Sequence, residues 1–458
     1  MAIVHLGLGA FHRAHMAAYT EDAEAAEPRG FGIAGVTMRS ADIRERLTPQ
    51  DGLYTLVERG PEGERARIIG VVRDVLSAPD DPAAVIARIA APGTRIVSFT
   101  ITEKGYALDP ATRQLRLDDP GIAHDLANPA APRTGIGLLA AGLARRRMEG
   151  LAGLTALCCD NLPSNGATLS QATLAFASTL NPALADWIAR EVSFPSCMVD
   201  RIVPATTAED RAAAERLTGL EDAAPVMAEP FSQWVVEDRF RAGRPAWERA
   251  GVEFVEDVAP YELMKLRLLN GSHSAMAYLG SLVGLSFIWE VVSDPDFHRF
   301  VEGLMGEAAE TVPLPTGDYR EALLARFANP ALGHRCRQIA MDGSQKLPQR
   351  LVGPIRERLA EGRSISHLAA AVAAWLRYVA GVDEQGRAYE VDDPLASRLA
   401  DLQRDKTPED RFAALIRFEP VFGTELPQDP RFVMPVADAY RLLWARGARA
   451  LVASLTPA

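Results

Sequence analysis

A short apolar strand that runs into a glycine turn opens the chain, and it restricts the possible folds more than any other feature. Residues 2–8 are mostly apolar, and Gly7 and Gly9 lead into a helix-like stretch over residues 10–26. In a strand–turn–helix unit of this kind, the first glycine makes the tight turn and the second lets a pyrophosphate approach the backbone. His12 stands where the GxGxxG pattern has its third glycine. The position of the turn, directly after the first strand, favours a dinucleotide site, with an ordinary turn between strand and helix as the alternative.

Further strand-like runs follow at residues 32–38, 67–72, 95–101 and 154–159, with helical or loop sequence between them. Strands that alternate with helices predict a mostly parallel sheet that is covered on both faces. We therefore expect an α/β fold with a doubly wound sheet in the N-terminal domain.

The sequence changes character after about residue 250, where patterns rich in Ala, Leu and Arg dominate. Helical spacing with few β-branched runs occurs at residues 261–282, 319–327, 365–380, 413–418 and 435–453. Before this point, the charge-rich residues 208–222 predict an exposed helix or an insertion. We expect two domains: residues 1–255 for dinucleotide binding, and residues 256–458, mostly α-helical, for substrate binding and catalysis.

The composition argues against several classes of partner. The formal net charge is −11, from 60 acidic and 49 basic side chains, whereas a nucleic-acid site needs a local excess of Lys and Arg. The 4 cysteines are too few and too irregularly spaced for a disulfide framework or a zinc-binding CxxC pair. No run approaches the ~18–20 apolar residues of a membrane span, and the first residues lack a basic signal region. We expect a cytoplasmic protein with a small-molecule substrate and neither a nucleic-acid nor a membrane partner.

The residues after the second predicted strand bear on the choice of nucleotide. A dinucleotide fingerprint has an acidic side chain there for the adenosine ribose. This chain instead has Met38, Arg39 and Ser40, followed by Asp42. Arg39 can meet the 2′-phosphate of NADP or lie as an ordinary solvated side chain, so the choice between NAD and NADP stays open.

Lysine is rare in this chain, so each lysine is a candidate for a specific role. It occurs only at Lys104, Lys265, Lys346 and Lys406, so the other 45 of the 49 basic side chains are arginine. Because arginine does not readily lose its proton, a lysine here is enriched at places where the amine must do so.

Lys265 lies in the helix that is predicted over residues 261–282. Glu262, Lys265, Asn270 and His273 project within an arc of about 140° on one side of that helix, at roughly 100° per residue. Apolar residues occupy the other directions, so we expect the helix to be enclosed. Loss of solvation there would lower the pKa of the lysine amine and let it accept a proton near neutral pH.

These side chains are the parts of a metal-free alcohol dehydrogenase. Hydride removal from a secondary alcohol needs a base, for which Lys265 is the candidate. Asn270 can donate its amide to the alkoxide that forms, and His273 can orient a substrate hydroxyl. The alternative is structural: Lys265 extends to solvent, Asn270 bonds locally and His273 is a buried core histidine.

A second polar cluster, residues 159–166, follows a predicted strand at its carboxyl end, where open α/β sheets bind ligands. Asn161 in this cluster can donate to a developing oxyanion. The Asn, Pro, Ser and Gly content of the cluster suits a plain turn equally well.

Several motifs occur together and in one order along most of the chain. They are Gly-Leu-Gly-Ala-Phe-His-Arg-Ala-His at 7–15, Gln-Asp-Gly-Leu-Tyr-Thr-Leu at 50–56, Thr-Glu-Lys-Gly-Tyr at 102–106, Cys-Asp-Asn at 159–161 with Asn-Gly at 165–166, Val-Asp-Arg-Ile at 199–202, Lys265 with Asn270 and His273, and Asp-Gly-Ser-Gln-Lys-Leu-Pro at 342–348. With these motifs the chain resembles the polyol-specific long-chain dehydrogenases, a family that includes mannitol 2-dehydrogenase and D-mannonate oxidoreductase (fructuronate reductase).

The resemblance implies a Rossmann-type domain, a mostly helical second domain, and a zinc-independent hydride transfer in the cleft between them. By the same resemblance, Lys265 looks like the general base and Asn161 and Asn270 like the oxyanion donors. His273 and Asp200 look like groups that position the substrate.

Further roles follow from the resemblance. Glu262 looks like the carboxylate on the proton route to solvent. The expected cofactor is NAD, with NADP open, and no metal is expected. The expected cofactor contacts are Gly7, Gly9, Phe11 and Arg39.

The resemblance leaves the substrate open between an acyclic hexitol and a hexonate, that is, mannitol/fructose or D-mannonate/D-fructuronate. Lys346 and Arg350, with Arg337 and His334 nearby in sequence, can bind polyol hydroxyls or a carboxylate, and a carboxylate explains more than one cation. They can also be an ordinary charged helix end. Two other functions stay as alternatives: a sugar-phosphate dehydrogenase, such as mannitol-1-phosphate dehydrogenase, and a non-catalytic nucleotide-sensing protein. The oligomeric state is not predicted.

Overall fold

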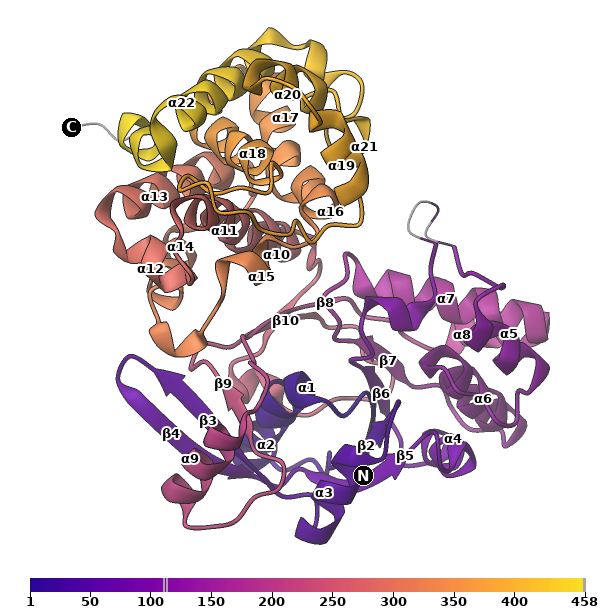
Figure 1. Ribbon diagram of the computed structural model, residues 1–458. Coiled ribbons are helices and arrows are strands. Elements are labelled where there is room, and N and C mark those ends of the chain that lie inside the picture. Colours follow the sequence, from indigo (N-terminus) through magenta and orange to yellow (C-terminus); the bar gives the residue numbers. More distant parts are fainter. Residues whose placement is uncertain (110–111, 113, 456–458) are drawn as a thin grey trace. The chain divides into compact units, whose positions relative to one another are not determined.

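The computed structural model describes residues 1–109, 112 and 114–455, and the chain divides between residues 259 and 260 into two compact units (Figure 1). The domain boundary that the sequence predicts after residue 255 lies close to this division.

A five-stranded parallel sheet forms the centre of the first unit. Its strands, in spatial order, are β5 (Val72–Ser77), β2 (Ile33–Thr37), β1 (Ile3–Leu6), β6 (Ile96–Phe99) and β7 (Thr155–Cys158). Every residue of β1, β2, β6 and β7 is buried, as expected for strands that are covered on both faces. The carboxyl ends of all five strands meet at one edge, with β1 in the middle.

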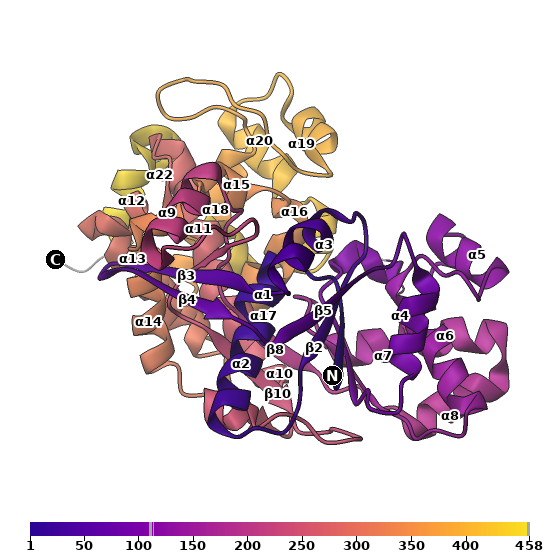
Figure 2. The same cartoon turned by 90° about the horizontal axis from the view of Figure 1, so that it is seen from below.

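Alternate side chains of β1 enter two different cores. Val4 and Leu6 belong to a core with helices α4 (Pro82–Ala90), α6 (Gly135–Met148) and α7 (Asn165–Leu180). Ile3 belongs to a second core that includes α2 (Met16–Ala26). Figures 1 and 2 show α2 and the group α4 and α6 on opposite sides of the sheet. The predicted α/β fold with a doubly covered parallel sheet is confirmed.

Two three-stranded sheets complete the first unit, and the sequence did not predict them. One has the order β4-β3-β9, from β3 (Tyr54–Gly60), β4 (Gly63–Ile69) and β9 (Val226–Ala228). The other has the order β11-β10-β8, from β8 (Cys197–Asp200), β10 (Gln233–Glu237) and β11 (Glu253–Val255).

The strand predicted over residues 67–72 is wrong. Strand β4 ends at Ile69 in an antiparallel hairpin with β3, and β5 begins at Val72 in the central sheet. The residues between them, Gly70 and Val71, carry the chain from one sheet to the other. Because no polar side chain interrupts the run from Ile68 to Val72, its composition hides the change of sheet.

The helix predicted over residues 10–26 is two helices. α1 (Ala10–Ala14) and α2 meet at His15, whose φ of −119° and ψ of −91° leave the helical path. The predicted exposed helix in 208–222 is α9 (Ala208–Thr218), which Thr207 caps. The other helices of this unit are α3 (Asp42–Leu47), η1 (Thr48–Gln50), η2 (Glu103–Tyr106), α5 (Pro120–Ala127), α8 (Pro182–Glu191) and η3 (Trp247–Ala250).

The described part of the second unit has helices and no strand, which confirms the mostly helical second domain. The elements are α10 (Ala259–Met264), η4 (Lys265–Asn270), α11 (Gly271–Val283), α12 (Ile288–Ser293), α13 (Pro295–Ala309), α14 (Gly317–Phe327), η5 (Pro330–Leu332), α15 (Cys336–Ala340), α16 (Gly343–Leu347), η6 (Pro348–Val352), α17 (Gly353–Ala360), α18 (Ser366–Tyr378), α19 (Ala396–Gln403), α20 (Pro408–Leu415), α21 (Glu419–Phe422), η7 (Leu426–Gln428) and α22 (Pro430–Leu455). The helix predicted over residues 413–418 is wrong, because α20 starts earlier, at the cap Thr407, and ends at Leu415.

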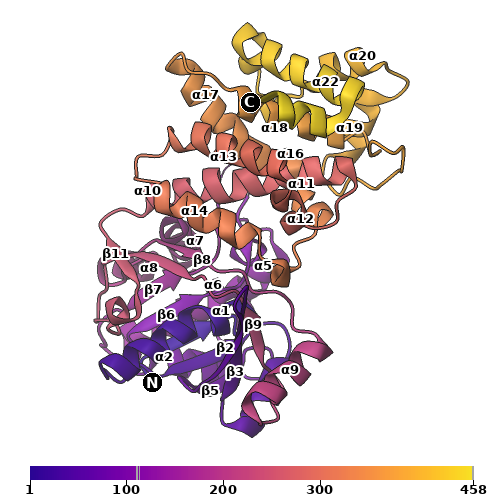
Figure 3. The ribbon, with the colours of Figure 1, turned by 90° about the vertical axis from the view of Figure 1, so that its left-hand side faces the viewer.

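Helix α18 is the central helix of the second unit. Its residues from Leu368 to Tyr378 are all buried, and Figure 3 shows it between α11 and α22. The stretch from Ala369 to Ala374 is alanine at every position except Val372. These small side chains let the neighbouring helices pack close to the α18 backbone. None of the described helices combines the length and the apolar character needed to cross a membrane.

Two buried histidines join β1 to α1. The rings of His5 and His12 stack, with 3.4 Å between centroids and 13° between planes. The ring nitrogens of His5 bond with Ser98 Oγ and Thr100 Oγ1, at 2.8 Å each. Burial lowers the pKa of His5 to about 3, against the opposing effect of a bond to the Gly7 carbonyl. Burial, with added repulsion from His5, also lowers the pKa of His12 well below its usual value, so both rings are neutral at pH 7.

We expect the first unit to lose stability as the pH falls below about 6.5. The unfolded chain then binds protons at His5 and His12 that the folded chain does not bind. The free energy of unfolding therefore falls, by up to about 1.4 kcal/mol per pH unit for each histidine. Urea unfolding between pH 7 and pH 5, followed by tryptophan fluorescence, measures this slope. His12→Phe keeps a stacked ring that cannot titrate. The free energy of unfolding of this variant should therefore fall less steeply with pH, by the amount that the uptake of about one proton contributes. An unchanged slope would contradict the assignment.

Candidate active site

The glycine turn at the carboxyl end of β1 leaves its backbone open. Gly7 has a φ of +102°, and a Cβ at this position would lie 2.1 Å from the carbonyl oxygen of Thr100, so only glycine fits. Gly9 is exposed, and among the described residues a Cβ there would meet only the Gly7 carbonyl oxygen, at 3.7 Å. This geometry leaves room for a pyrophosphate to approach the backbone, as a dinucleotide site requires.

Two further predicted cofactor residues lie close to this turn in the fold. Phe11 on α1 is half-buried, and its ring stacks on His15 with 5.1 Å between centroids. Arg39 is exposed, just beyond the end of β2, the strand next to β1. A dinucleotide fingerprint gives this position to the contact with the adenosine ribose.

A buried carboxylate, Asp160, ties the ends of β6 and β7 together, and sequence reasoning did not single it out. Its oxygens accept hydrogen bonds from the amides of Ile101 and Thr102, at 2.9 Å each, and from the Tyr106 hydroxyl at 2.6 Å. Burial raises the pKa of Asp160, and these hydrogen bonds oppose the rise. The only sequence signal for it was its place in the Cys-Asp-Asn motif.

The hydrogen bonds of Asp160 fix the position of the next residue, Asn161. Asn161 is exposed just beyond the carboxyl end of β7, at the same sheet edge as Gly7. Asn165 is buried, and its Nδ2 donates to the carbonyl oxygens of Asp160 at 3.1 Å and of Cys197 at 2.7 Å. The cluster is therefore a fixed turn that also presents one amide at the edge.

Asp200 lies on a different sheet from the one whose strand β7 precedes Asn161. It is the last residue of β8, is 4% exposed, and pairs with Gln233 of the antiparallel strand β10. The next residue, Arg201, donates to the carbonyl oxygens of Ala14 at 2.6 Å and of Glu229 at 2.8 Å. These bonds fix the end of β8 beside α1, the helix that follows the glycine turn.

The helix that carries Lys265 contains a π turn. α10 ends at Met264, the π segment η4 spans Lys265–Asn270, and α11 begins at Gly271. The Gly271 amide donates to the carbonyl of Leu266, five residues earlier. Such segments are rare and occur frequently at functional sites.

The π turn changes which side chains share one side of the helix. In an α-helix, Asn270 would point roughly 140° away from Lys265, because each residue adds about 100°. In a π turn the hydrogen bonds join residues five apart, so each residue turns less about the axis and Asn270 points closer to the direction of Lys265. Both side chains are half-buried, as is Glu262, one turn earlier on α10. The sequence pattern alone places Lys265 and Asn270 at the two limits of the arc, whereas the π turn brings the directions of the two side chains closer to one another.

His273, three residues beyond Asn270, lies among other rings. It is 8% exposed, and its ring centroid lies 5.1 Å from that of His334 and 5.3 Å from that of Phe327. Within the described part of the chain, His273 Nε2 is buried without a hydrogen-bond partner. A buried nitrogen in this state costs free energy unless a ligand or a water bonds to it.

Positive side chains surround this histidine. Burial lowers the pKa of His273 well below its usual value, and His334, Arg350, Arg326 and Lys346 lower it further. Burial also lowers the pKa of His334 to about 4, with Arg326 adding to the effect. Both rings are therefore neutral at pH 7, in a region of positive potential. Arg326, buried in the last turn of α14, was missed because nothing in its spacing separates it from the many other arginines.

The amine of Lys346 bonds to backbone carbonyls. Its Nζ donates to the carbonyl oxygens of Met341 at 2.5 Å and Ile339 at 3.5 Å, and Asp342 lies 3.9 Å away. Burial lowers the pKa of Lys346, and the charge of Arg350 adds to this effect, whereas nearby aspartates oppose it.

The other predicted cations divide into two groups. Arg350 is half-buried on η6, and its Nη1 donates to Ser274 Oγ at 3.0 Å. Like His334, it belongs to the surroundings of His273. Arg337 is exposed instead, and its guanidinium lies over the Tyr389 ring, 4.7 Å from the centroid.

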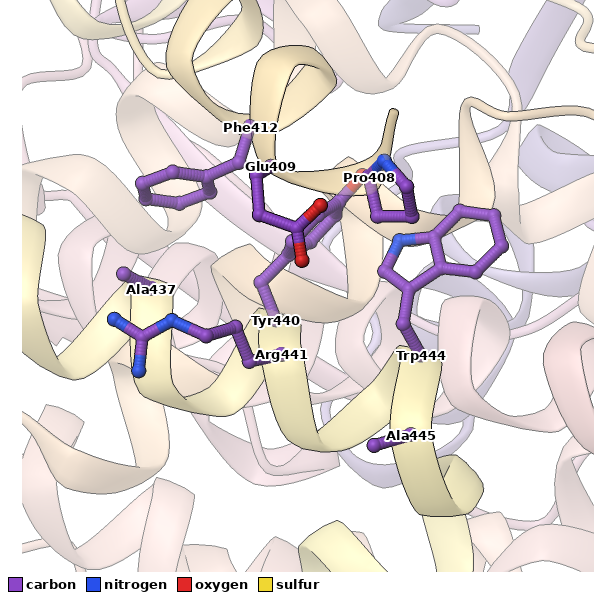
Figure 4. Close-up of a pocket in the computed structure, with 8 residues that line it drawn as sticks. All are labelled: Pro408, Glu409, Phe412, Ala437, Tyr440, Arg441, Trp444 and Ala445. Atoms are coloured by element: carbon purple, nitrogen blue, oxygen red, sulfur yellow. The ribbon is translucent and has the colours of Figure 1, made fainter. Parts of the chain in front are cut away.

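A hollow of about 520 Å³ between α20 and α22 contains none of the predicted site residues (Figure 4). It is lined by Pro408, Glu409, Phe412, Ala437, Tyr440, Arg441, Trp444 and Ala445. These side chains include no lysine, histidine or amide. The hollow therefore does not offer the chemistry of the predicted site.

Among the residues that the structure describes, no three His, Cys, Asp or Glu side chains form a group able to hold a metal ion. The four cysteines are all free and buried.

Two family models cover the chain. The mannitol dehydrogenase Rossmann domain matches residues 1–249, and the mannitol dehydrogenase C-terminal domain matches residues 257–444. Among curated relatives, the chain is 45% identical to a D-mannonate oxidoreductase of Escherichia coli (strain K12), over 99% of this chain and 95% of the relative. It is 44% identical to a mannitol 2-dehydrogenase of Phaeosphaeria nodorum, over 98% of this chain and 80% of the relative.

Solved structures agree with these matches. The mannitol 2-dehydrogenase of Pseudomonas fluorescens, in a ternary complex with NAD and D-mannitol, has a TM-score of 0.83 and 41% identity over 99% of this chain and 94% of that one. A D-sorbitol dehydrogenase in substrate-free form has a TM-score of 0.92 and 32% identity over 99% of this chain and 95% of that one. The resemblance seen in the sequence motifs is confirmed, and the chain belongs to the mannitol dehydrogenase family.

Proposed function

We propose that the protein is an NAD(P)-dependent, metal-independent oxidoreductase that interconverts a secondary alcohol of an acyclic hexitol or hexonate with its ketone. The π turn carries this proposal, because it puts Lys265 and Asn270 on one side of a helix. A base next to an amide donor is what proton removal from an alcohol and support of the resulting oxyanion need. Membership of the mannitol dehydrogenase family supports the same class of reaction.

In this proposal the first unit binds NAD at the turn of Gly7 and Gly9, with Phe11 and Arg39 as further contacts. The open backbone at Gly9 supports this role, as does the likeness to a mannitol 2-dehydrogenase in complex with NAD. When bound, the nicotinamide supplies the acceptor or donor of the hydride. Arg39 at the end of β2 keeps NADP as the second candidate nucleotide.

The chain's own groups handle the proton and the oxygen. In the oxidative direction, Lys265 Nζ takes the proton of the substrate hydroxyl, and the side-chain amides of Asn270 and Asn161 donate to the oxygen that is left. Glu262, one turn before Lys265, passes the proton on to solvent. In the reductive direction the same groups deliver the proton to the carbonyl oxygen.

The surroundings of His273 favour a hexonate over a hexitol. His273 Nε2 is suited to bond a substrate hydroxyl, and Asp200 is proposed to bind a second one. Lys346 and Arg350 are proposed to hold a carboxylate, because their positive potential around a neutral histidine suits an anion. The similarity to a D-mannonate oxidoreductase supports this choice. The same cations would suit a phosphate, so a hexitol phosphate is the second candidate substrate.

Replacing Lys265 by Ala should lower turnover by about a hundred- to ten-thousandfold, because the general base is lost. Nucleotide affinity, measured by titration of the protein fluorescence, should stay nearly unchanged. Lys406→Ala is the matched control: it removes another half-buried lysine, whose Nζ donates to the Leu402 carbonyl. Wild-type turnover in Lys265→Ala would remove the base from the mechanism.

Lys346→Met should raise the KM for D-mannonate and D-fructuronate by about tenfold or more, because a hydrogen bond to a charged group is lost. The KM for mannitol and fructose should change much less. Steady-state assays at the nicotinamide absorbance band measure both, with NAD(H), NADP(H) and mannitol 1-phosphate included. A phosphate-only activity would point to the sugar-phosphate dehydrogenase, and no turnover of any substrate would point to the nucleotide sensor.

Dialysis against EDTA or 1,10-phenanthroline should leave turnover unchanged, because the proposed proton and oxyanion groups are all side chains. Turnover is measured before and after dialysis, and again after addition of Zn²⁺. Loss on chelation with recovery on Zn²⁺ would overturn the metal-independent mechanism.

A further inference from the structure

We propose that Arg350 and Ser274 are positioning residues that hold the π segment η4 in the form that aligns Lys265 with Asn270. This inference rests on the proposed function, in which those two side chains act on the same substrate oxygen. It concerns how the alignment is kept.

A π segment needs support from its surroundings, because proteins use the α-helix almost everywhere else. A second π segment, η6 (Pro348–Val352), packs against η4. In η6 the Gly353 amide donates to the Pro348 carbonyl, five residues earlier. Two rare segments therefore lie side by side in one unit.

Arg350 of η6 bonds to residues on both sides of the boundary between η4 and α11. Its Nη1 donates to the carbonyl oxygen of Asn270 at 3.4 Å and to Ser274 Oγ at 3.0 Å. Asn270 is the last residue of the π segment, and Ser274 lies one turn further on α11, fully buried. One guanidinium nitrogen thus spans the end of the π turn, and a charged donor makes these bonds stronger than neutral ones.

The backbones of the two segments also come close at this boundary. A Cβ on Gly271 would lie 3.1 Å from the carbonyl oxygen of Arg350, which is tighter than ordinary contact. A side chain at Gly271 would therefore push η6 away from η4 and strain the Arg350 bonds.

A second anchor holds the other side of η4. Arg267, in the middle of the segment, donates to the Thr311 carbonyl at 2.7 Å and to the Glu357 carboxylate at 2.6 Å. With η4 held there, the bonds of Arg350 decide the position of its C-terminal end, where Asn270 lies.

The test uses Ser274→Ala, which removes one acceptor of Arg350 while leaving its charge in place. We expect kcat to fall by about tenfold, because a small misalignment of base and donor weakens the reaction strongly. The loss of kcat should be the same for D-mannonate and mannitol, with little change in the KM for mannitol or for NAD; the KM for D-mannonate can change as well, because Arg350 is also proposed to hold its carboxylate. The acidic limb of the kcat profile should also shift, because Lys265 moves relative to its neighbours.

Gly271→Ala is the second variant and should give the same pattern, because it separates the segments without removing an acceptor of Arg350. Ser281→Ala is the matched control, since it removes another buried hydroxyl of α11 that contacts neither segment in the described hydrogen bonds. Thermal unfolding confirms that each variant is folded.

Wild-type kcat in folded Ser274→Ala and Gly271→Ala would overturn the inference, and so would a loss confined to the KM for D-mannonate. Lys265→Ala separates this failure from failure of the proposed function. If Lys265→Ala is inactive while Ser274→Ala and Gly271→Ala keep full activity, only the positioning role is wrong.

Discussion

One extra residue in a helical turn is the constraint on which the proposed chemistry depends. Without the π turn, the side chains of Lys265 and Asn270 would point roughly 140° apart around the helix axis, at the two limits of their shared side. The turn is held from two sides, by Arg350 at its end and by Arg267 at its middle. The frame to which these arginines connect comes from neighbouring helices: Arg267 donates to Glu357 of α17, and Arg350 donates to Ser274 of α11.

In the first unit, packing also holds a turn in place, here the glycine turn that follows β1. The third glycine of a dinucleotide fingerprint serves the close approach of helix and strand, and here His12 stands in its place. Its ring lies flat on that of His5, which bonds with Thr100, and Thr100 in turn donates to the Gly7 carbonyl at 2.7 Å. The turn is therefore supported from beneath by two neutral aromatic rings, and the buried contact replaces the missing glycine.

The sequence predicts the fold class because strand spacing, the glycine turn and the alanine-rich helices are all local patterns. It also singles out Lys265, Asn270 and His273, because lysine is scarce and the three share a helix. Their alignment was beyond prediction, since a π turn has no composition of its own and depends on packing against η6. Arg326 was missed for a related reason: in a chain so rich in arginine, only the folded structure distinguishes a buried one. The strand expected at 67–72 failed because an apolar run does not reveal where a chain leaves one sheet for another.

The alanine stretch of α18 decides how the helical unit tolerates change. Where a core is made of large side chains, truncation leaves holes, and the usual danger is loss of volume. Around Ala369 to Ala374 there is almost nothing to truncate. Here the destabilising change is an increase in volume, because an added methylene overpacks the contacts of α18 with α22 and α11. At these alanine positions the interior therefore accepts only the smallest side chains, in contrast to the large side chains that fill the rest of the same core.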